Sequence, residues 1–164
     1  MTTVLLGSLL TIAAWCDWRH RKIPNALTSS AIMLGCCYQW YTGTFWTSLS
    51  GVMGAFLLTA IPVACKGMGM GDLKLLMAVG AWSGWTEVYP LFLHSMVLCV
   101  LFVLLYPRSW PRLGKNLFVM AAGWTAHRQL WLPGVEKTAF AFPYAVFLLG
   151  AFLLRHLLHK VGAA

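Results

Sequence analysis

The chain has 164 residues, of which 60% are apolar and 10% are charged. Soluble domains average about 45–50% apolar and about 25% charged residues, so this composition excludes a disordered tail and nearly every soluble fold. The net charge is +8, but the cations lie mostly between apolar runs, where they meet lipid head groups, so we expect no nucleic-acid partner.

Six apolar segments follow one another along the chain, each approaching the roughly 20 residues that a membrane-spanning helix needs. They cover about residues 2–18, 26–41, 49–65, 73–85, 88–106 and 139–158. The first lacks a basic region before it and a cleavage site after it, so we expect a retained helix and not a signal peptide. The sequence therefore predicts an all-α fold, a polytopic integral membrane bundle of about six transmembrane helices.

Basic residues fall on one side of this arrangement. Ten of the twelve lysines and arginines lie around residues 17–25, 66–74 and 107–138, which places these stretches in the cytoplasm by the positive-inside rule. The prolines and helical apolar spacing within 107–138 predict an amphipathic helix in the membrane interface, with an ordinary connecting loop as the alternative. We expect one membrane-embedded domain over residues 1–164.

The chain contains two aspartates, Asp17 and Asp72, each at the expected cytoplasmic end of an apolar segment. A carboxylate in a bilayer core costs about 2.5–3.5 kcal/mol on insertion scales, so it is rarely kept without a role. Two facing carboxyls that share a proton can activate water, one as general base and the other as general acid. Two alternatives stay open: Asp17 pairs with Arg19 or Arg21 while Asp72 caps a helix, or the pair translocates ions.

Two short motifs contain these aspartates, and both resemble motifs of the type IV prepilin peptidases. Residues 17–25, in which Asp17 precedes Ile23-Pro24-Asn25, resemble that family's first aspartate motif. Residues 69–74, with the pattern Gly-x-Gly-Asp-x-Lys, resemble its second motif. Pro143 and Tyr144 are similar to a proline-containing motif that the family carries at its last span.

The resemblance implies a GxGD-type aspartyl protease that crosses the bacterial inner membrane several times, with its active site facing the cytoplasm. Such enzymes cleave the basic leader peptide from prepilin or pseudopilin substrates. Asp17 and Asp72 are the implied catalytic pair. Supporting roles are implied for Ile23, Pro24, Asn25, Gly69, Gly71 and Lys74, and the candidate substrate contacts are Met68, Met70, Glu136, Pro143 and Tyr144.

Four of these residues carry a more specific expectation. Glycine tolerates positive φ and lets another chain approach closely, so Gly69 and Gly71 are expected in an irregular loop that presents Asp72 and admits substrate. Lys74 either tunes the charge of Asp72 or extends its ammonium to the interface. Asn25 is expected to be the N-cap of the second helix.

Larger family members carry paired Cys-x-x-Cys motifs and also N-methylate the mature pilin with S-adenosylmethionine. Those cysteines do not occur here, so the resemblance is to short members, and we expect peptidase activity alone, without metal or cofactor and with membrane lipid as a further partner. Two rival functions remain: a proton- or cation-coupled transporter component, and a non-catalytic membrane scaffold of a pilus assembly system.

Overall fold

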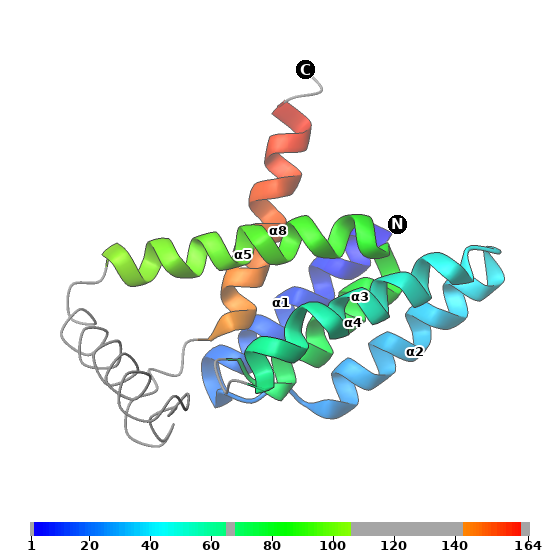
Figure 1. The fold of residues 1–164 in the computed structure, drawn as a ribbon, viewed down its shortest axis with the longest axis horizontal. Helices are drawn as coiled ribbons and strands as arrows, with labels where there is room; N and C mark the ends of the chain where they lie inside the picture. The colour runs from blue at the N-terminus through cyan, green and yellow to red at the C-terminus, as the bar shows by residue number, and fades with distance from the viewer. Residues whose placement is uncertain (1, 65–67, 106–142, 162–164) are drawn as a thin grey trace, which may run out of the picture. The chain divides into compact units, whose positions relative to one another are not determined.

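A computed structural model describes residues 2–64, 68–105 and 143–161, and the regular structure within them is helical throughout (Figure 1). The helices in chain order are α1 (Thr2–His20), α2 (Asn25–Tyr41), α3 (Phe45–Ala64), α4 (Met70–Ser83), α5 (Trp85–Leu105) and α8 (Tyr144–Val161). Each predicted apolar segment contributes one helix, which confirms the all-α prediction for the described residues. The segment 107–138 lies outside them.

Two of these helices, α3 and α5, are long and apolar enough to cross a membrane. Many of their apolar side chains point outward, among them Leu57, Ile61 and Val97, as expected for a surface that faces lipid. In α8 the apolar part, Tyr144–Leu158, is shorter. That the other four helices also cross the membrane stays a prediction.

The chain divides into two compact units, one made of Met1–Leu98 with Pro143–Ala164 and the other of Cys99–Phe142. Of the second unit, the structure describes residues 99–105, the last part of α5. Both aspartates lie in the first unit.

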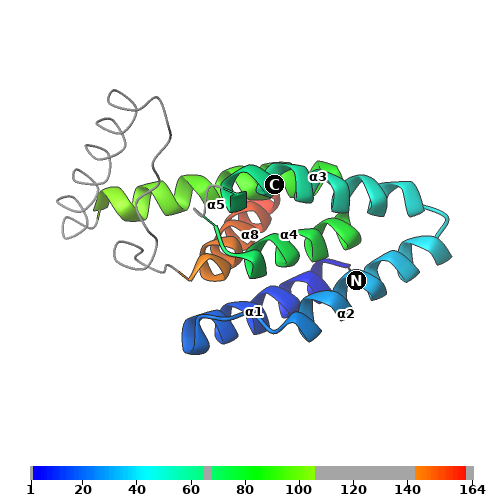
Figure 2. The same cartoon turned by 60° about the horizontal axis from the view of Figure 1, so that its bottom comes forward.

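Within the first unit, α2 and α3 both pack on α4, and the three helices run side by side in Figures 1 and 2. The crossing of α3 and α4 is close because each presents a glycine: a Cβ on Gly51 would lie 2.2 Å from the carbonyl oxygen of Gly80. On the other side, Trp82 Nε1 donates to the carbonyl of Ala31 at 2.9 Å, and Gln39 Nε2 donates to the carbonyl of Trp82 at 3.0 Å. These contacts fix α4, whose first turn carries Asp72.

Further contacts of this unit join α1 and α5 to α8. α1 packs against α8, and a Cβ on Gly7 of α1 would lie 3.6 Å from the Phe152 ring of α8. α5 meets α8 through a hydrogen bond between the Ser95 and Tyr144 hydroxyls and an ion pair between Glu87 and Arg155 at 2.9 Å. Of these contacts, the hydroxyl pair lies at the start of α8, whereas the ion pair lies in the second half of that helix.

Candidate active site

Asp17 lies in the last turn of α1 and is 8% exposed. Its Oδ2 accepts a hydrogen bond of 3.2 Å from the backbone N–H of Ala145, the second residue of α8. The first N–H groups of a helix have no partner within the helix and favour a negative charge. Asp17 therefore fills a capping role for a helix that is distant in sequence.

Within the described residues, Asp17 forms no close ion pair with Arg19 or Arg21, the alternative that the sequence left open, although the charge of Arg21 acts on Asp17. Among the described residues, the one ion pair joins Glu87 and Arg155, on α5 and α8. Arg21 instead ends α1: it adopts a left-handed backbone conformation with φ of 51°, and its N–H donates to the carbonyl of Asp17 at 2.8 Å.

Asp72 lies in the first turn of α4, three residues after the N-cap residue Gly69. Its carboxyl accepts a hydrogen bond from the backbone N–H of Gly69, the arrangement in which an acidic side chain at the third helical position reaches back to the N-cap. The predicted capping role of Asp72 is therefore present. This hydrogen bond orients the Asp72 carboxyl and does not prevent the carboxyl from transferring a proton.

The electrostatics link the two carboxyls. Asp72 precedes the apolar segment 73–85, so it lies outside the part of α4 expected to cross the membrane. Burial and the negative charge of Asp17 raise the pKa of Asp72 to about 7, although the Gly69 N–H acts in the opposite direction. A carboxyl that keeps its proton near neutral pH beside a second carboxyl can serve general acid–base catalysis.

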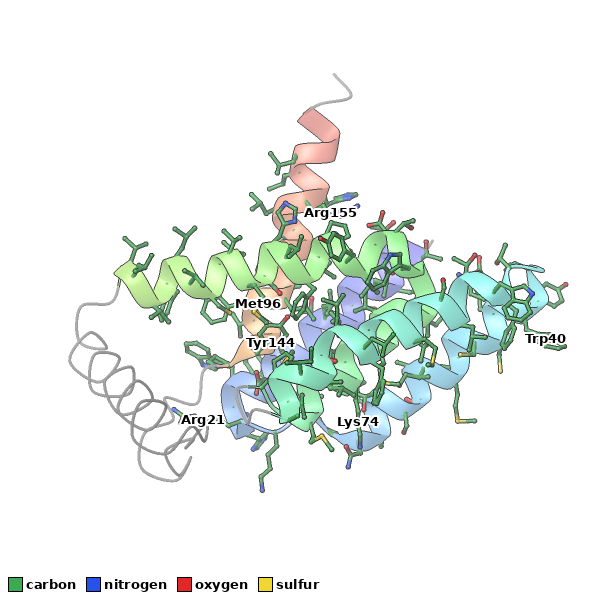
Figure 3. The ribbon with its side chains drawn as sticks, in the orientation of Figure 1. Arg21, Trp40, Lys74, Met96, Tyr144 and Arg155 are labelled. Carbon is green, nitrogen blue, oxygen red and sulfur yellow. The ribbon has the colours of Figure 1, made fainter. Side chains whose placement is uncertain are left out.

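The two aspartate motifs also contact each other directly. Lys74 Nζ, labelled in Figure 3, donates to Asn25 Oδ1 at 3.0 Å. A Cβ on Gly71 would lie 3.4 Å from the Cβ of Ile23, so the backbone of α4 runs close to that side chain. Residues 23–25 thus lie against the first turn of α4, and Lys74 joins the motifs rather than forming an ion pair with Asp72.

The N-cap prediction for Asn25 is wrong. The N-cap of α2 is Pro24, with extended backbone (φ −60°, ψ 128°) and no side-chain capping bond, and Asn25 is the first helical residue. Its side-chain oxygen accepts from Lys74 instead. The side-chain oxygen that would cap α2 therefore accepts from a lysine of α4.

The expectation that both motif glycines lie in an irregular loop is wrong for Gly71, whereas Gly69 does lie outside α4, with extended backbone. α4 begins at Met70, so Gly71 is already helical, and among the described glycines positive φ occurs at Gly43 and Gly84, not in the motif. The close-approach argument does apply to Gly69, where a Cβ would lie 3.1 Å from Asp72 Oδ2. The absence of a side chain at Gly69 therefore leaves space for the Asp72 carboxyl, and it is not required for the backbone conformation.

The other predicted residues are distributed as follows. Pro143 and Tyr144 stand at the start of α8, directly before the N–H that reaches Asp17. Met68 is half-buried and Met70 is exposed beside Asp72. Glu136 lies outside the described residues. No substrate is present, so the predicted contacts with substrate stay predictions.

Sequence reasoning missed two members of the site. The Ala145 N–H carries no signal in the sequence, because any residue other than proline supplies one. Ser95 could have been noticed as a hydroxyl within the apolar segment 88–106. In the described part of the chain, no group of three or more histidine, cysteine, aspartate or glutamate side chains could hold a metal ion.

Known proteins that resemble this chain identify its family. The model of the type IV leader peptidase family matches residues 4–104, more than half of the chain. Similar curated proteins are named prepilin leader peptidase/N-methyltransferase. The one from Pseudomonas aeruginosa is 29% identical over 142 residues, covering 77% of this chain and 48% of that protein. Those from Burkholderia pseudomallei and Stutzerimonas stutzeri are 36% and 30% identical, covering 57% and 79% of this chain.

The coverage is asymmetric. The chain spans 33% of the Burkholderia pseudomallei protein and 48% of the Stutzerimonas stutzeri protein, so it corresponds to half or less of these relatives. No solved structure matches the chain significantly.

Proposed function

The chain belongs to the type IV leader peptidase family, and we propose that it is a membrane aspartyl endopeptidase. It cleaves the basic leader peptide from a prepilin-like substrate at the cytoplasmic face of the bacterial inner membrane. The observation that carries the proposal is the coupled pair of carboxyls: Asp17 and Asp72 come from different helices, and the charge of one raises the pKa of the other.

The pair supports hydrolysis by general acid–base catalysis. The ionised carboxyl removes a proton from water as its oxygen attacks the scissile carbonyl carbon, and the protonated carboxyl donates to the carbonyl oxygen. Collapse of the tetrahedral intermediate breaks the C–N bond: the carboxyl that took the proton from water gives it to the departing nitrogen, and the other carboxyl takes back the proton from the hydroxyl of the intermediate. The titration belongs to the pair, so the two residues act as one unit.

The charge distribution supports the cytoplasmic location. Arg19, Arg21 and Lys22 follow Asp17, and Lys66 and Lys74 flank Asp72. Basic residues beside membrane helices mark the cytoplasmic side. Both aspartates therefore belong to the side of the membrane on which a leader peptide is found before its removal.

The test is cleavage of a co-expressed prepilin-like substrate by the wild type and by Asp17→Asn and Asp72→Asn, at equal abundance in the membrane. Asparagine keeps the size of aspartate and removes the ionisable group. We expect both variants to lose cleavage by at least about 10³-fold, since each removes half of the proton-transfer pair. Glu87→Gln, which removes an exposed carboxylate on α5, is the matched control and should cleave normally.

Aspartate-to-glutamate variants separate this proposal from its rivals. A peptidase should lose activity with glutamate at either position, because catalysis needs both carboxyls placed to within about 0.5 Å. A proton- or cation-coupled transporter component would retain partial function, since the charge is kept. A scaffold would be indifferent to all four substitutions, and cleavage by either asparagine variant would refute the aspartyl mechanism.

A further inference from the structure

The hydroxyls of Ser95 and Tyr144 form a buried pair, next in the chain to the backbone N–H that donates to Asp17. Ser95 of α5 is fully buried and Tyr144 of α8 is 7% exposed, and their oxygens are 2.6 Å apart. The Ser95 hydroxyl donates to the carbonyl of Phe92 at 2.7 Å, which uses its one proton. The Tyr144 hydroxyl is therefore the donor to Ser95 Oγ.

This hydrogen bond fixes the part of α8 that reaches Asp17. Tyr144 is the first residue of α8 and Ala145 the second, so the tyrosine side chain and the N–H that donates to Asp17 Oδ2 belong to neighbouring residues. A buried tyrosine hydroxyl without a partner is costly, so the first turn of α8 is held where this bond can form. The position of this turn of α8 against α5 sets the direction in which the Ala145 N–H points.

We propose that Tyr144 and Ser95 are positioning residues for Asp17, acting through the backbone N–H of Ala145. Among the hydrogen bonds between described residues, none joins the side chain of Ser95 or Tyr144 to the carboxyl of Asp17 or Asp72. Their function is to hold the donor that orients the Asp17 carboxylate towards its partner. This inference rests on the proposed peptidase function for its kinetic consequences, and on the contacts alone for its spectroscopic ones.

Loss of this hydrogen bond has a defined consequence for catalysis. Without it the first turn of α8 can shift, so the Ala145 N–H no longer holds the Asp17 carboxyl in one orientation. The rate of the chemical step should therefore fall, while substrate binding is unchanged.

The kinetic test compares Tyr144→Phe, Ser95→Ala and the double variant. Each single variant should lower kcat about tenfold with KM within about twofold, a pattern typical of a loss confined to the transition state. The double variant should be no worse than either single one, because all three remove the hydrogen bond between Tyr144 and Ser95. Ser95→Ala also removes a hydrogen bond to the carbonyl of Phe92, within α5. Ser95→Thr keeps the hydroxyl and should restore most of kcat.

The matched control is Ser48→Ala, which removes a fully buried serine hydroxyl from α3, where it donates to Cys36 Sγ. It should leave kcat unchanged. An equal loss in Ser48→Ala, or wild-type kcat in Tyr144→Phe, would overturn the positioning role.

A second readout does not depend on catalysis. The chain has two aspartates, so labelling with carboxyl-¹³C aspartate gives two signals, which Asp72→Asn assigns. We expect Tyr144→Phe to shift the Asp17 signal, and Ser48→Ala to leave it in place. An unshifted Asp17 signal in Tyr144→Phe overturns the inference, whereas cleavage by Asp17→Asn overturns the peptidase function and leaves this spectroscopic test intact.

Discussion

At the scale of single residues, the two carboxyls are held in different ways. Asp72 is oriented by the N-terminal N–H of its own helix, which lies three residues away in the sequence. Asp17 is oriented by an N–H of α8, from the opposite end of the chain. The position of Asp72 therefore depends on local helix geometry, whereas that of Asp17 depends on the packing of α1 against α8.

The two motif glycines are expected to respond differently to alanine. A Cβ at position 69 would lie 3.1 Å from Asp72 Oδ2, so the carboxyl must move by a few tenths of an ångström, whereas at position 71 the nearest atom is the Ile23 Cβ at 3.4 Å. We expect Gly69→Ala to lower kcat by about tenfold, which corresponds to about 1.4 kcal/mol. Gly71→Ala should stay within about twofold of the wild type.

Gly71→Ala is the matched control for this comparison, since both substitutions add one methyl group in or beside the first turn of α4. Neither glycine has positive φ, so backbone strain does not separate them. Cleavage assays with both variants at equal abundance in the membrane measure the loss of activity that each substitution causes. Equal losses would show that the motif glycines act through the backbone or through substrate, not through room for Asp72.

The titration of Asp72 is expected to depend on Asp17. Burial is the largest cause of its raised pKa and the charge of Asp17 is the second. Asp17→Asn removes that charge, so the pKa of Asp72 should fall below about 7 but stay above its usual value of 3.8. In this variant Asp72 is the sole aspartate, so ¹³C titration of labelled protein in detergent micelles reports it alone.

The same shift predicts how catalysis depends on pH. In the wild type, Asp72 loses its proton as the pH rises past about 7, and the pair then lacks its general acid. The rate of cleavage should therefore fall on the alkaline side of neutrality. A midpoint for Asp72 that does not respond to Asp17→Asn would contradict the electrostatic coupling of the two carboxyls.

At the scale of helices, α4 is positioned by close backbone contact. A Cβ on Gly80 would lie 2.4 Å from the carbonyl oxygen of Gly51 on α3, so Gly80→Ala must push the helices apart. We expect it to lower stability by about 1–3 kcal/mol, or roughly 2–4 °C in Tm per kcal/mol for a chain of this size. Thermal unfolding in detergent measures this change.

Gly150→Ala in α8 provides the control with the opposite sign. There the nearest atom to an added Cβ is Leu98 Cδ1 at 3.6 Å, an ordinary van der Waals distance. Alanine favours a helix over glycine by about 0.5–1 kcal/mol, so this variant should be as stable as the wild type or slightly more so. A drop in Tm equal to that of Gly80→Ala would show that close packing of α3 and α4 is not what fixes α4.

The helices were predictable from the sequence because each apolar segment is bounded by polar or glycine-containing residues, and burial of apolar surface needs no knowledge of the partner. The contact made by Asn25 is an example of what the sequence does not predict. Local chemistry favours it as an N-cap, but its oxygen bonds to Lys74, which no pattern within residues 17–25 reveals. The Ala145 N–H is likewise supplied by packing, not by a residue type.

The residues of the candidate site also differ in whether the sequence alone can reveal them. Asp17 and Asp72 stand out because they are the two aspartates of a highly apolar chain, and the burial cost of a carboxylate makes each informative. The sequence singles out Tyr144 as a candidate substrate contact and not for its bond to α5, and Ser95 does not stand out at all, since hydroxyls within apolar helices commonly bond to their own backbone. Ser95 does so as well, and only the fold shows that it also accepts from Tyr144.

At the scale of the whole molecule, the proposed function requires that the end of the helices carrying both aspartates faces the cytoplasm. In Figure 3, Arg21 and Lys74 lie at one end of the packed helices and Trp40 at the other. Ten of the twelve lysines and arginines belong to the stretches 17–25, 66–74 and 107–138, which favours the cytoplasm for the aspartate end.

Cysteines placed at the two ends of α2 test this orientation. Lys22, just before α2, and Tyr41, its last residue, are both exposed. In a background without the five native cysteines, a membrane-impermeant thiol reagent should label Tyr41→Cys in spheroplasts and label Lys22→Cys only after the membrane is opened. The reverse pattern would place Asp17 and Asp72 on the outer face, where a cytoplasmic leader peptide could not reach them. Labelling of both sites in spheroplasts would mean that α2 does not cross the membrane.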